Sequence, residues 1–348
     1  MSTHPLSKEE SKFLSASLGG SDYEVHRLAG DASSRRYFRL IKNESSYVLM
    51  QWEPFVDDGN YPFLNIHQHF QKHKVLVPNV ISKAPELGLV LLEDLGDLTL
   101  ERKFWENQNQ SMALPFYKQS IDELIKIHYS ATADRIPNVV AFKIEFNTEK
   151  LLWEMNYGRE HLLEKFCKLK LSAKVNDELS QNFYDICRLL DKEPKRICHR
   201  DYHSRNIMLK LGKTRIIDFQ DARMGPIQYD LVSLVHDSYV DMNDSLRNEV
   251  LDYYLARARE VTNSPIPYDE FFSVFRLQMI QRCFKACGSF ASFYNMREDS
   301  RYLKYLKPTI KKVAQVVQQF PEYSTFYSVM VDQGLLEKNF ENPNEVSK

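Results

Sequence analysis

The sequence lacks the features of a membrane protein, of a nucleic-acid-binding protein and of a protein stabilised by disulfides. Its longest apolar run near the middle, LGLVLL, is too short to span a bilayer, and its first twenty residues lack the apolar core of a secretory signal. The formal net charge of −1 gives no global field that would attract nucleic acid or an anionic membrane. Five cysteines without a C-x-x-C pair indicate reduced thiols. We therefore expect a cytoplasmic protein that binds neither nucleic acid nor membrane.

What the sequence does contain is enough apolar material for a large core. Of its 348 residues, 43% are hydrophobic and 12% are aromatic, which is too apolar for a disordered chain. The length exceeds that of one small domain and suits two lobes or two domains.

The N-terminal part has the composition of short strands separated by turns. Runs rich in aromatic and β-branched residues alternate with the turn-forming segments GDASS and KNESS. Gly59, Asn60 and Pro62 predict the start of a helix that ends before Pro78. The strands expected here lie within residues 23–30, 35–41, 47–54 and 88–96, the last of them running into an acidic turn.

The rest of the sequence is mainly helical. Helical periodicity extends from Phe116 to about Leu190 and resumes after Tyr229. Two short strands, 207–209 and 215–218, are joined by a turn that contains glycine. This order predicts an α+β, two-lobed fold, with a small β-rich lobe over residues 1–95 and a larger helical lobe over residues 96–348.

The strongest chemical signal is HRDYHSRN, which follows the pattern H-R-D-x-x-x-x-N. Phosphoryl transfer needs one carboxylate near the attacking hydroxyl and further oxygen ligands for a metal ion. Asp201 is the candidate catalytic carboxylate, and Asn206 is the first candidate metal ligand. Asp218, in IIDF, follows a short strand seventeen residues after Asp201 and is the second candidate ligand. The spacing predicts a kinase that uses ATP and Mg²⁺.

These segments resemble the aminoglycoside phosphotransferase family, a branch of the protein-kinase-like superfamily, from about Ser21 to Lys307. HRDYHSRN is similar to the family loop H-x-D-x-H-x-x-N, and IIDFQDARMGPIQYDLVSL is similar to its metal-binding segment and the G-P…Y-D-L motif that follows. The resemblance implies a protein-kinase-like fold, structural roles for His199 and Asp230 beside the catalytic loop, and contact of His203 with substrate. On the residues alone, Asp230 fits equally well as a helix N-terminal aspartate.

The spacing after Asp218 argues against a protein Ser/Thr kinase. Such kinases carry a long activation segment after their metal-binding aspartate. Here Gly225-Pro226 and Tyr229-Asp230 follow within twelve residues, so no such segment fits. A kinase of small molecules is therefore favoured.

The nucleotide phosphates are expected at the segment from Leu28 to Leu40, although it lacks G-x-G-x-x-G. Backbone amides in its turn could hold phosphate oxygens. Strand alternation puts Arg35 and Arg39 on one face and Arg36 on the other, and one of these faces should look into the cleft. The candidate phosphate ligands are Asp31, Ala32, Ser33, Ser34, Arg35 and Arg36.

The lysine that kinases carry in V-A-I-K is missing, because Met50 stands at that position. The helix predicted over residues 61–74 also has no glutamate to pair with a lysine. Either the arginines replace the lysine, or the chain is a nucleotide-binding pseudokinase without turnover. The presence of Asp201, Asn206 and Asp218 together favours the first interpretation.

Adenine is expected under the crossover LLEDLG. The resemblance implies that the base bonds to main-chain atoms there, which makes Glu93 and Leu95 candidates. Val48 and Leu92 are candidate apolar walls, with a plain core role as the alternative.

The acceptor is indicated by IQRCFKACGSFASF, taken together with GDASSRRYFR. Both are similar to the sugar kinases that phosphorylate the anomeric hydroxyl of N-acetylmuramate and N-acetylglucosamine in bacterial cell-wall recycling. The lactyl carboxylate of N-acetylmuramate would need a cation, which Arg282 or Lys285 could supply. Trp153 and Tyr157, four residues apart, could stack on a sugar ring, although core packing is the commoner role of such a pair.

Charge gives an independent indication about the acceptor. An enzyme for polycationic aminoglycosides should have an acidic binding region. Residues 141–196 contain eleven basic and ten acidic side chains, which fits a neutral or anionic sugar better. An aminoglycoside or another small alcohol remains the alternative acceptor for the same fold.

Overall fold

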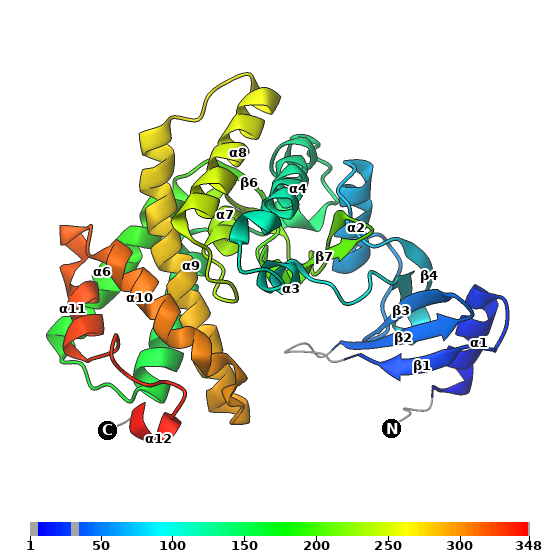
Figure 1. The fold of residues 1–348 in the computed structure, drawn as a ribbon, viewed down its shortest axis with the longest axis horizontal. Helices are drawn as coiled ribbons and strands as arrows, with labels where there is room; N and C mark the ends of the chain where they lie inside the picture. The colour runs from blue at the N-terminus through cyan, green and yellow to red at the C-terminus, as the bar shows by residue number, and fades with distance from the viewer. Residues whose placement is uncertain (1–5, 29–34, 347–348) are drawn as a thin grey trace.

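The computed structural model describes residues 6–28 and 35–346, which form a small sheet-based lobe and a larger helical lobe (Figure 1). The two-lobed α+β fold expected from the sequence is confirmed. The elements of the small lobe are α1 (Lys8–Leu18), β1 (Glu24–Arg27), β2 (Arg36–Lys42), β3 (Ser45–Gln51), α2 (Pro62–Lys72), β4 (Val80–Ala84) and β5 (Leu89–Glu93).

One antiparallel sheet, with strand order β1-β2-β3-β5-β4, forms the small lobe. α1 covers its outer face, where Leu14 packs against strand residues such as Phe38 and Leu49. α1 was not predicted from the sequence, although Ser7 and Glu10 form a capping box at its start. β4 was also missed.

α2 lies between the sheet and the helical lobe, close to where it was predicted, and begins with Pro62 in its first turn. Its buried face contributes Phe63, Ile66 and Phe70 to a core that also contains Met50 of β3 and much of the helical lobe. The two lobes therefore share one continuous hydrophobic core through this helix.

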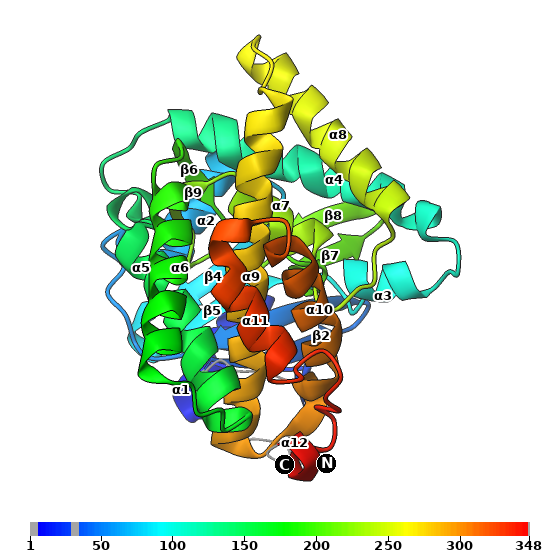
Figure 2. The same cartoon turned by 90° about the vertical axis from the view of Figure 1, so that its left-hand side faces the viewer.

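The helical lobe is arranged around the long helix α9, which packs against α5, α7 and α10 (Figures 1 and 2). The polypeptide enters it after β5, through a crossover over residues 94–99. Its helices are α3 (Leu100–Trp105), α4 (Leu114–Ile125), α5 (Thr148–Gly158), α6 (Ala173–Asp191), α7 (Gln228–Val235), α8 (Asp244–Thr262), α9 (Tyr268–Arg297), α10 (Leu306–Val317), α11 (Ser324–Asp332) and α12 (Pro343–Val346).

Two small antiparallel ribbons lie inside this lobe. The predicted hairpin is present as β7 (Ile207–Lys210) and β8 (Lys213–Ile216). The second ribbon pairs β6 (Lys195–Cys198) with β9 (Arg223–Pro226) and was not predicted. β9 begins five residues after Asp218, so the polypeptide leaving Asp218 enters a paired strand almost at once. Over the described ranges, no helix combines the length and apolarity needed to cross a membrane.

Candidate active site

Asp230 holds the start of the catalytic loop. It is buried in the first turn of α7, and its two carboxylate oxygens accept the backbone N–H groups of His199 at 2.7 Å and Arg200 at 2.9 Å. The His199 side chain bonds through Nε2 to the carbonyl of Ile217 at 2.9 Å, which ties the loop to the segment before Asp218. His199 and Asp230 thus contact backbone and lie behind the cavities that the site opens onto.

Asp237, just beyond α7, holds the second half of the loop and was missed by the sequence analysis. Its carboxylate accepts bonds from the N–H and hydroxyl of Ser204 at 2.8 and 2.5 Å, and from the N–H of Tyr239 at 2.8 Å. The Tyr202 hydroxyl donates to the Ser120 carbonyl at 2.6 Å. The loop is therefore fixed at both ends by buried carboxylates.

Asn206 stands between the other two functional groups. Its Nδ2 donates to the Asp201 carbonyl at 3.0 Å and lies 3.4 Å from Oδ2 of Asp218. Asp218 adopts a left-handed backbone conformation (φ 63°), which is uncommon for a residue with a side chain and is frequent at functional sites. Gln220, missed in the sequence, donates to Oδ1 of Asp218 at 2.8 Å.

The oxygen atoms of this group suit a hard divalent cation. Since the Asn206 nitrogen donates to a carbonyl, the Asn206 side-chain oxygen is the atom left for a ligand. Together with the Asp218 carboxylate it forms an all-oxygen donor set, the type that Mg²⁺ prefers.

Phe219 anchors the metal-binding segment in the shared core. Its side chain is fully buried and stacks on Phe63 of α2 with ring centroids 5.1 Å apart. Phe70, two turns further along α2, lies at 5.9 Å. The position of Asp218 is therefore coupled to the helix that joins the two lobes.

Asp201 is surrounded by cations. A terminal nitrogen of Arg282 lies 3.6 Å from Oδ1, and Nε of Arg200 lies 3.9 Å from Oδ2. Burial alone would raise the pKa of Asp201, but Lys285, Arg200 and Arg282 outweigh burial and hold this pKa below its usual range. The carboxylate is thus ionised and poised to accept a hydrogen bond.

Asp201 also stands where two cavities meet. The larger, about 730 Å³, runs between the lobes, and the smaller, about 190 Å³, lies between the end of α7 and α9. Asp201, His203 and Tyr239 are among the residues that line both cavities. We refer to the larger as the nucleotide cleft and to the smaller as the acceptor cavity, after the roles proposed for them below.

The inner face of β2 lines the nucleotide cleft. Arg35, Tyr37 and Arg39 point into it, as strand alternation requires, together with Val48 of β3. Arg36 lies on the opposite face, exposed to solvent and outside the cleft, so we do not assign it to the phosphates. The predicted backbone ligands Asp31, Ala32, Ser33 and Ser34 lie outside the described residues.

Arg39 is occupied by the crossover rather than directed at a phosphate site. Its guanidinium donates to both carboxylate oxygens of Asp94, at 2.6 and 3.0 Å, and to Asp97 at 3.0 and 3.1 Å. This bidentate pair links β2 to the start of the helical lobe. Of the three arginines, Arg35 remains the candidate for the phosphates.

Met50 is fully buried in the core at the position where a lysine was expected. In the sheet it pairs with Tyr37 of β2. Arg35 lies over the ring of Trp52, with its guanidinium carbon 4.5 Å from the ring centroid. Burial raises the pKa of Tyr37 and of Tyr61, and the charge of Arg35 acts to lower both. Arg35, just before β2, therefore supplies a cation to the cleft on the side of the strand that pairs with Met50.

The crossover offers main-chain atoms to a base. The Glu93 side chain is used internally, because its oxygens bond to Lys210 at 2.9 Å and Asn79 at 3.0 Å. Glu93, Leu95 and Leu92 all line the cleft. The Glu93 side chain therefore has a structural role, which is consistent with the expectation that only its main-chain atoms contact the base.

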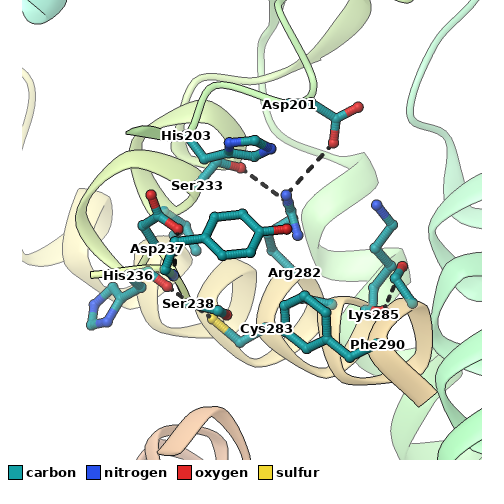
Figure 3. Close-up of a pocket in the computed structure, with 14 residues that line it drawn as sticks. Asp201, His203, Ser233, His236, Asp237, Ser238, Arg282, Cys283, Lys285 and Phe290 are labelled. Atoms are coloured by element: carbon teal, nitrogen blue, oxygen red, sulfur yellow. Dashed lines mark hydrogen bonds and ion pairs between the residues drawn. The ribbon is translucent and has the colours of Figure 1, made fainter. Parts of the chain in front are cut away.

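Both cations that line the acceptor cavity come from α9 (Figure 3). Arg282 and Lys285 enter it from this helix, and His203 enters from the catalytic loop. The Arg282 Nε donates to the Ser233 hydroxyl at 3.0 Å. Burial lowers the pKa of His203 against the opposing effect of Asp237 and Asp201, so this ring is neutral at neutral pH.

Trp153 and Tyr157, the candidate sugar-stacking pair, lie outside the lining of both cavities. Their rings are 5.4 Å apart on α5. The Tyr157 hydroxyl donates to Ser292 of α9 at 2.7 Å, and the Lys150 ammonium lies over the Trp153 ring. In this structure the two side chains therefore contact other residues of α5 and α9.

Comparison with known proteins assigns the chain to a family. The sequence matches the family described as "Phosphotransferase enzyme family" over residues 24–263, which is most of the chain and includes every group of the catalytic loop. The chain belongs to this phosphotransferase family. It is accordingly an enzyme that transfers a phosphoryl group to an alcohol.

Among sequence relatives, the chain is 28% identical over 313 residues to an N-acetylmuramate/N-acetylglucosamine kinase of Neisseria meningitidis serogroup B, covering 89% of this chain and 91% of the relative. A protein of the same name from Pseudomonas aeruginosa is 27% identical, with 86% and 85% of the two chains covered.

Solved structures of the phosphotransferase fold superpose on most of the chain. The gentamicin complex of APH(2″)-IIa has a TM-score of 0.59 at 16% identity and covers 90% of this chain and 97% of its own. The choline kinase LicA from Streptococcus pneumoniae has a TM-score of 0.59 at 14% identity, with 88% and 98% covered. At such identities these structures establish the fold alone.

Proposed function

We propose that the protein is an ATP-dependent kinase that phosphorylates the anomeric hydroxyl of N-acetylmuramate, N-acetylglucosamine or both. The observation that carries this proposal is the position of Asp201, whose carboxylate stands on the shared wall of the nucleotide cleft and the acceptor cavity. The amino sugar is suggested by the names of the relatives, which align over most of the chain. Five cysteines, none in a disulfide, are compatible with a cytoplasmic enzyme.

In the proposed reaction Asp201 accepts a hydrogen bond from the sugar hydroxyl and orients its oxygen toward the γ-phosphoryl group. An anomeric hydroxyl is more acidic than an ordinary alcohol, so a carboxylate with a low pKa is an adequate partner. Orientation and charge compensation, rather than a strong base, are then the main contributions to rate.

Asn206 and Asp218 are proposed to hold Mg²⁺ through their side-chain oxygens. When bound, the ion would offset the charge of the ATP phosphates. Arg35 is proposed to add a second positive charge on the side of β2, in place of the lysine that Met50 replaces. Main-chain atoms of Glu93 and Leu95 are proposed to bind adenine, with Val48 and Leu92 against its faces.

The charges of the acceptor cavity argue against a polycationic acceptor. Arg200, Arg282 and Lys285 all act on Asp201 at close range. An aminoglycoside would bring several ammonium groups next to these cations, and like charges in a partly buried site repel strongly. A neutral or acidic sugar does not meet this repulsion.

The test is an assay of ADP release with MgATP and a panel of acceptors: N-acetylmuramate, N-acetylglucosamine, glucose, choline and an aminoglycoside. We expect turnover with the N-acetylated amino sugars, and ³¹P and ¹³C NMR of the product should place the phosphate on C1. Turnover of the aminoglycoside or choline alone would overturn the assignment of the acceptor. ATP binding without turnover of any acceptor would support the pseudokinase interpretation instead.

A further inference from the structure

Two cations enter the acceptor cavity from α9, and they differ in how they are used. Arg282 is already engaged, with Nε on the Ser233 hydroxyl and a terminal nitrogen 3.6 Å from Asp201. The Lys285 ammonium has neither a hydrogen-bond acceptor nor a carboxylate partner among residues 6–28 and 35–346. Figure 3 shows its side chain beside that of Arg282, on the side of the helix that faces Asp201.

The carboxylates near Lys285 are committed elsewhere. Asp237 holds Ser204 through two hydrogen bonds. Glu154 of α5 is fully buried, and one of its oxygens accepts bonds from Tyr229 at 3.1 Å and Gln281 at 2.9 Å. Asp201 faces the reacting hydroxyl. The Lys285 ammonium is therefore left without a hydrogen-bonded or ion-paired anion in the described part of the chain, although Asp201 and Glu154 act on it at longer range.

A partly buried ammonium without a partner is unfavourable, because burial removes hydration that nothing replaces. Burial, together with repulsion from Arg282, lowers the pKa of Lys285 to about 8, although Asp201 and Glu154 act in the opposite sense. An anion delivered by the substrate would give the ammonium its missing partner.

We propose that Lys285 binds a carboxylate carried by the acceptor sugar and so makes the enzyme selective for acidic over neutral amino sugars. This inference rests on the proposed function and extends it. Of the two sugars named for the relatives, N-acetylmuramate has a lactyl carboxylate and N-acetylglucosamine has none. The remaining anion that could reach this wall is the phosphoryl group in transfer, and the two ligands predict different kinetics.

The first test compares both sugars in Lys285→Gln and Lys285→Arg. In Lys285→Gln we expect kcat/KM to fall about 10- to 100-fold more for N-acetylmuramate than for N-acetylglucosamine, which is the range of one charge-assisted hydrogen bond. Most of the difference should appear in KM. Lys285→Arg keeps the charge and should recover most of the preference. Lys174→Gln, a lysine exposed on α6, controls for net charge.

The second test is the pH dependence of the ratio of the two kcat/KM values. With a pKa of about 8, Lys285 is charged below that pH and loses its charge as the pH rises through it, so the preference for N-acetylmuramate should fall up to about tenfold between pH 7 and pH 9. Lys285→Arg should show a flat ratio. Groups that face Lys285 affect both sugars and cancel in the ratio: Arg200, Asp201 and His203 of the catalytic loop, Arg282 of α9, Glu154 of α5 and Asp237 beyond α7.

Each outcome decides the inference. An equal loss of kcat for both sugars in Lys285→Gln would assign the lysine to the phosphoryl group and overturn selection by carboxylate. An unchanged ratio in Lys285→Gln and across pH would overturn it as well. If the wild-type enzyme phosphorylates neither sugar, the proposed function itself fails, and that result is distinct from the other two.

Discussion

At the scale of single residues, some positions of the loop HRDYHSRN are held by hydrogen bonds from the rest of the protein, and others face the cavities. The backbone of His199 and Arg200 is held by Asp230, and that of Ser204 by Asp237. Asp201, between these anchors, is left free to face the cavities. Rigid support of this kind is what allows a carboxylate to be held in one orientation toward a bound hydroxyl.

Replacement of Asp201 by asparagine keeps the size of the side chain and removes its charge. We expect kcat to fall by about 10² to 10⁴, the usual contribution of such a group, while nucleotide still binds. Because cations hold the pKa of Asp201 below its usual range, the wild-type carboxylate should stay ionised and active well into mildly acidic solution.

Steady-state kinetics and calorimetric titration with ATP would measure both quantities, with the exposed Asp177→Asn as a matched control. Near-normal turnover in Asp201→Asn would contradict the assigned role.

The adjacent residues Arg35 and Arg36 form a natural pair for the nucleotide site, since only Arg35 lines the cleft. In Arg35→Ala we expect KM for ATP to rise about 10-fold or more, as for a lost charge-assisted bond to phosphate. In Arg36→Ala we expect a change of less than about twofold, because an exposed charge is well screened. Equal effects of the two substitutions would show that the side of the strand does not matter.

At the scale of elements, the acceptor cavity depends on a close crossing of α5 and α9. A Cβ atom added to Gly288 would lie 2.5 Å from Cα of Gly158, and one added to Gly158 would lie 2.8 Å from the Phe284 ring. The two helices therefore approach with almost nothing between their backbones. This contact sets Glu154 of α5 beside the charged residues of α9.

Gly288→Ala tests this contact, because the close crossing and an isolated helix predict changes of opposite sign in the free energy of unfolding. Away from other elements, glycine to alanine inside a helix should stabilise by about 1 kcal/mol. Here the methyl group meets backbone, so we expect destabilisation by about 1–3 kcal/mol and weaker binding of the sugar. Urea unfolding followed by circular dichroism measures the first effect, and a stabilised variant would contradict the crossing.

At the scale of the whole molecule, α2 and the large core bind the lobes into one unit. Met50 of β3, Phe63 of α2 and Phe219 beyond β8 belong to the same buried cluster. A shared core predicts a single cooperative unfolding transition rather than one for each lobe. Differential scanning calorimetry should show this, and MgADP at about 100 times its Kd should stabilise the protein by about 2.7 kcal/mol. Two separated transitions would contradict the shared core.

Most of this architecture could be predicted from local signals in the sequence, although α1 was missed despite its capping box. Strand composition and helical periodicity predicted the two-lobed fold, and the motif from Asp201 to Asp218 predicted the carboxylates to which we assign catalysis and metal binding. Three features could not be found this way, because each depends on contacts between distant segments. β6 and β9 pair across about 25 residues, Asp237 acts on Ser204, and the use of Arg39 by Asp94 follows only from the folded crossover.

β9 begins five residues after Asp218 and is at once paired with β6. In a signalling kinase the corresponding stretch is a loop that phosphorylation can order or release. Here that stretch leads directly into a paired strand. The position of Asp218 is therefore set by strand pairing within the fold, without a loop that must first be ordered.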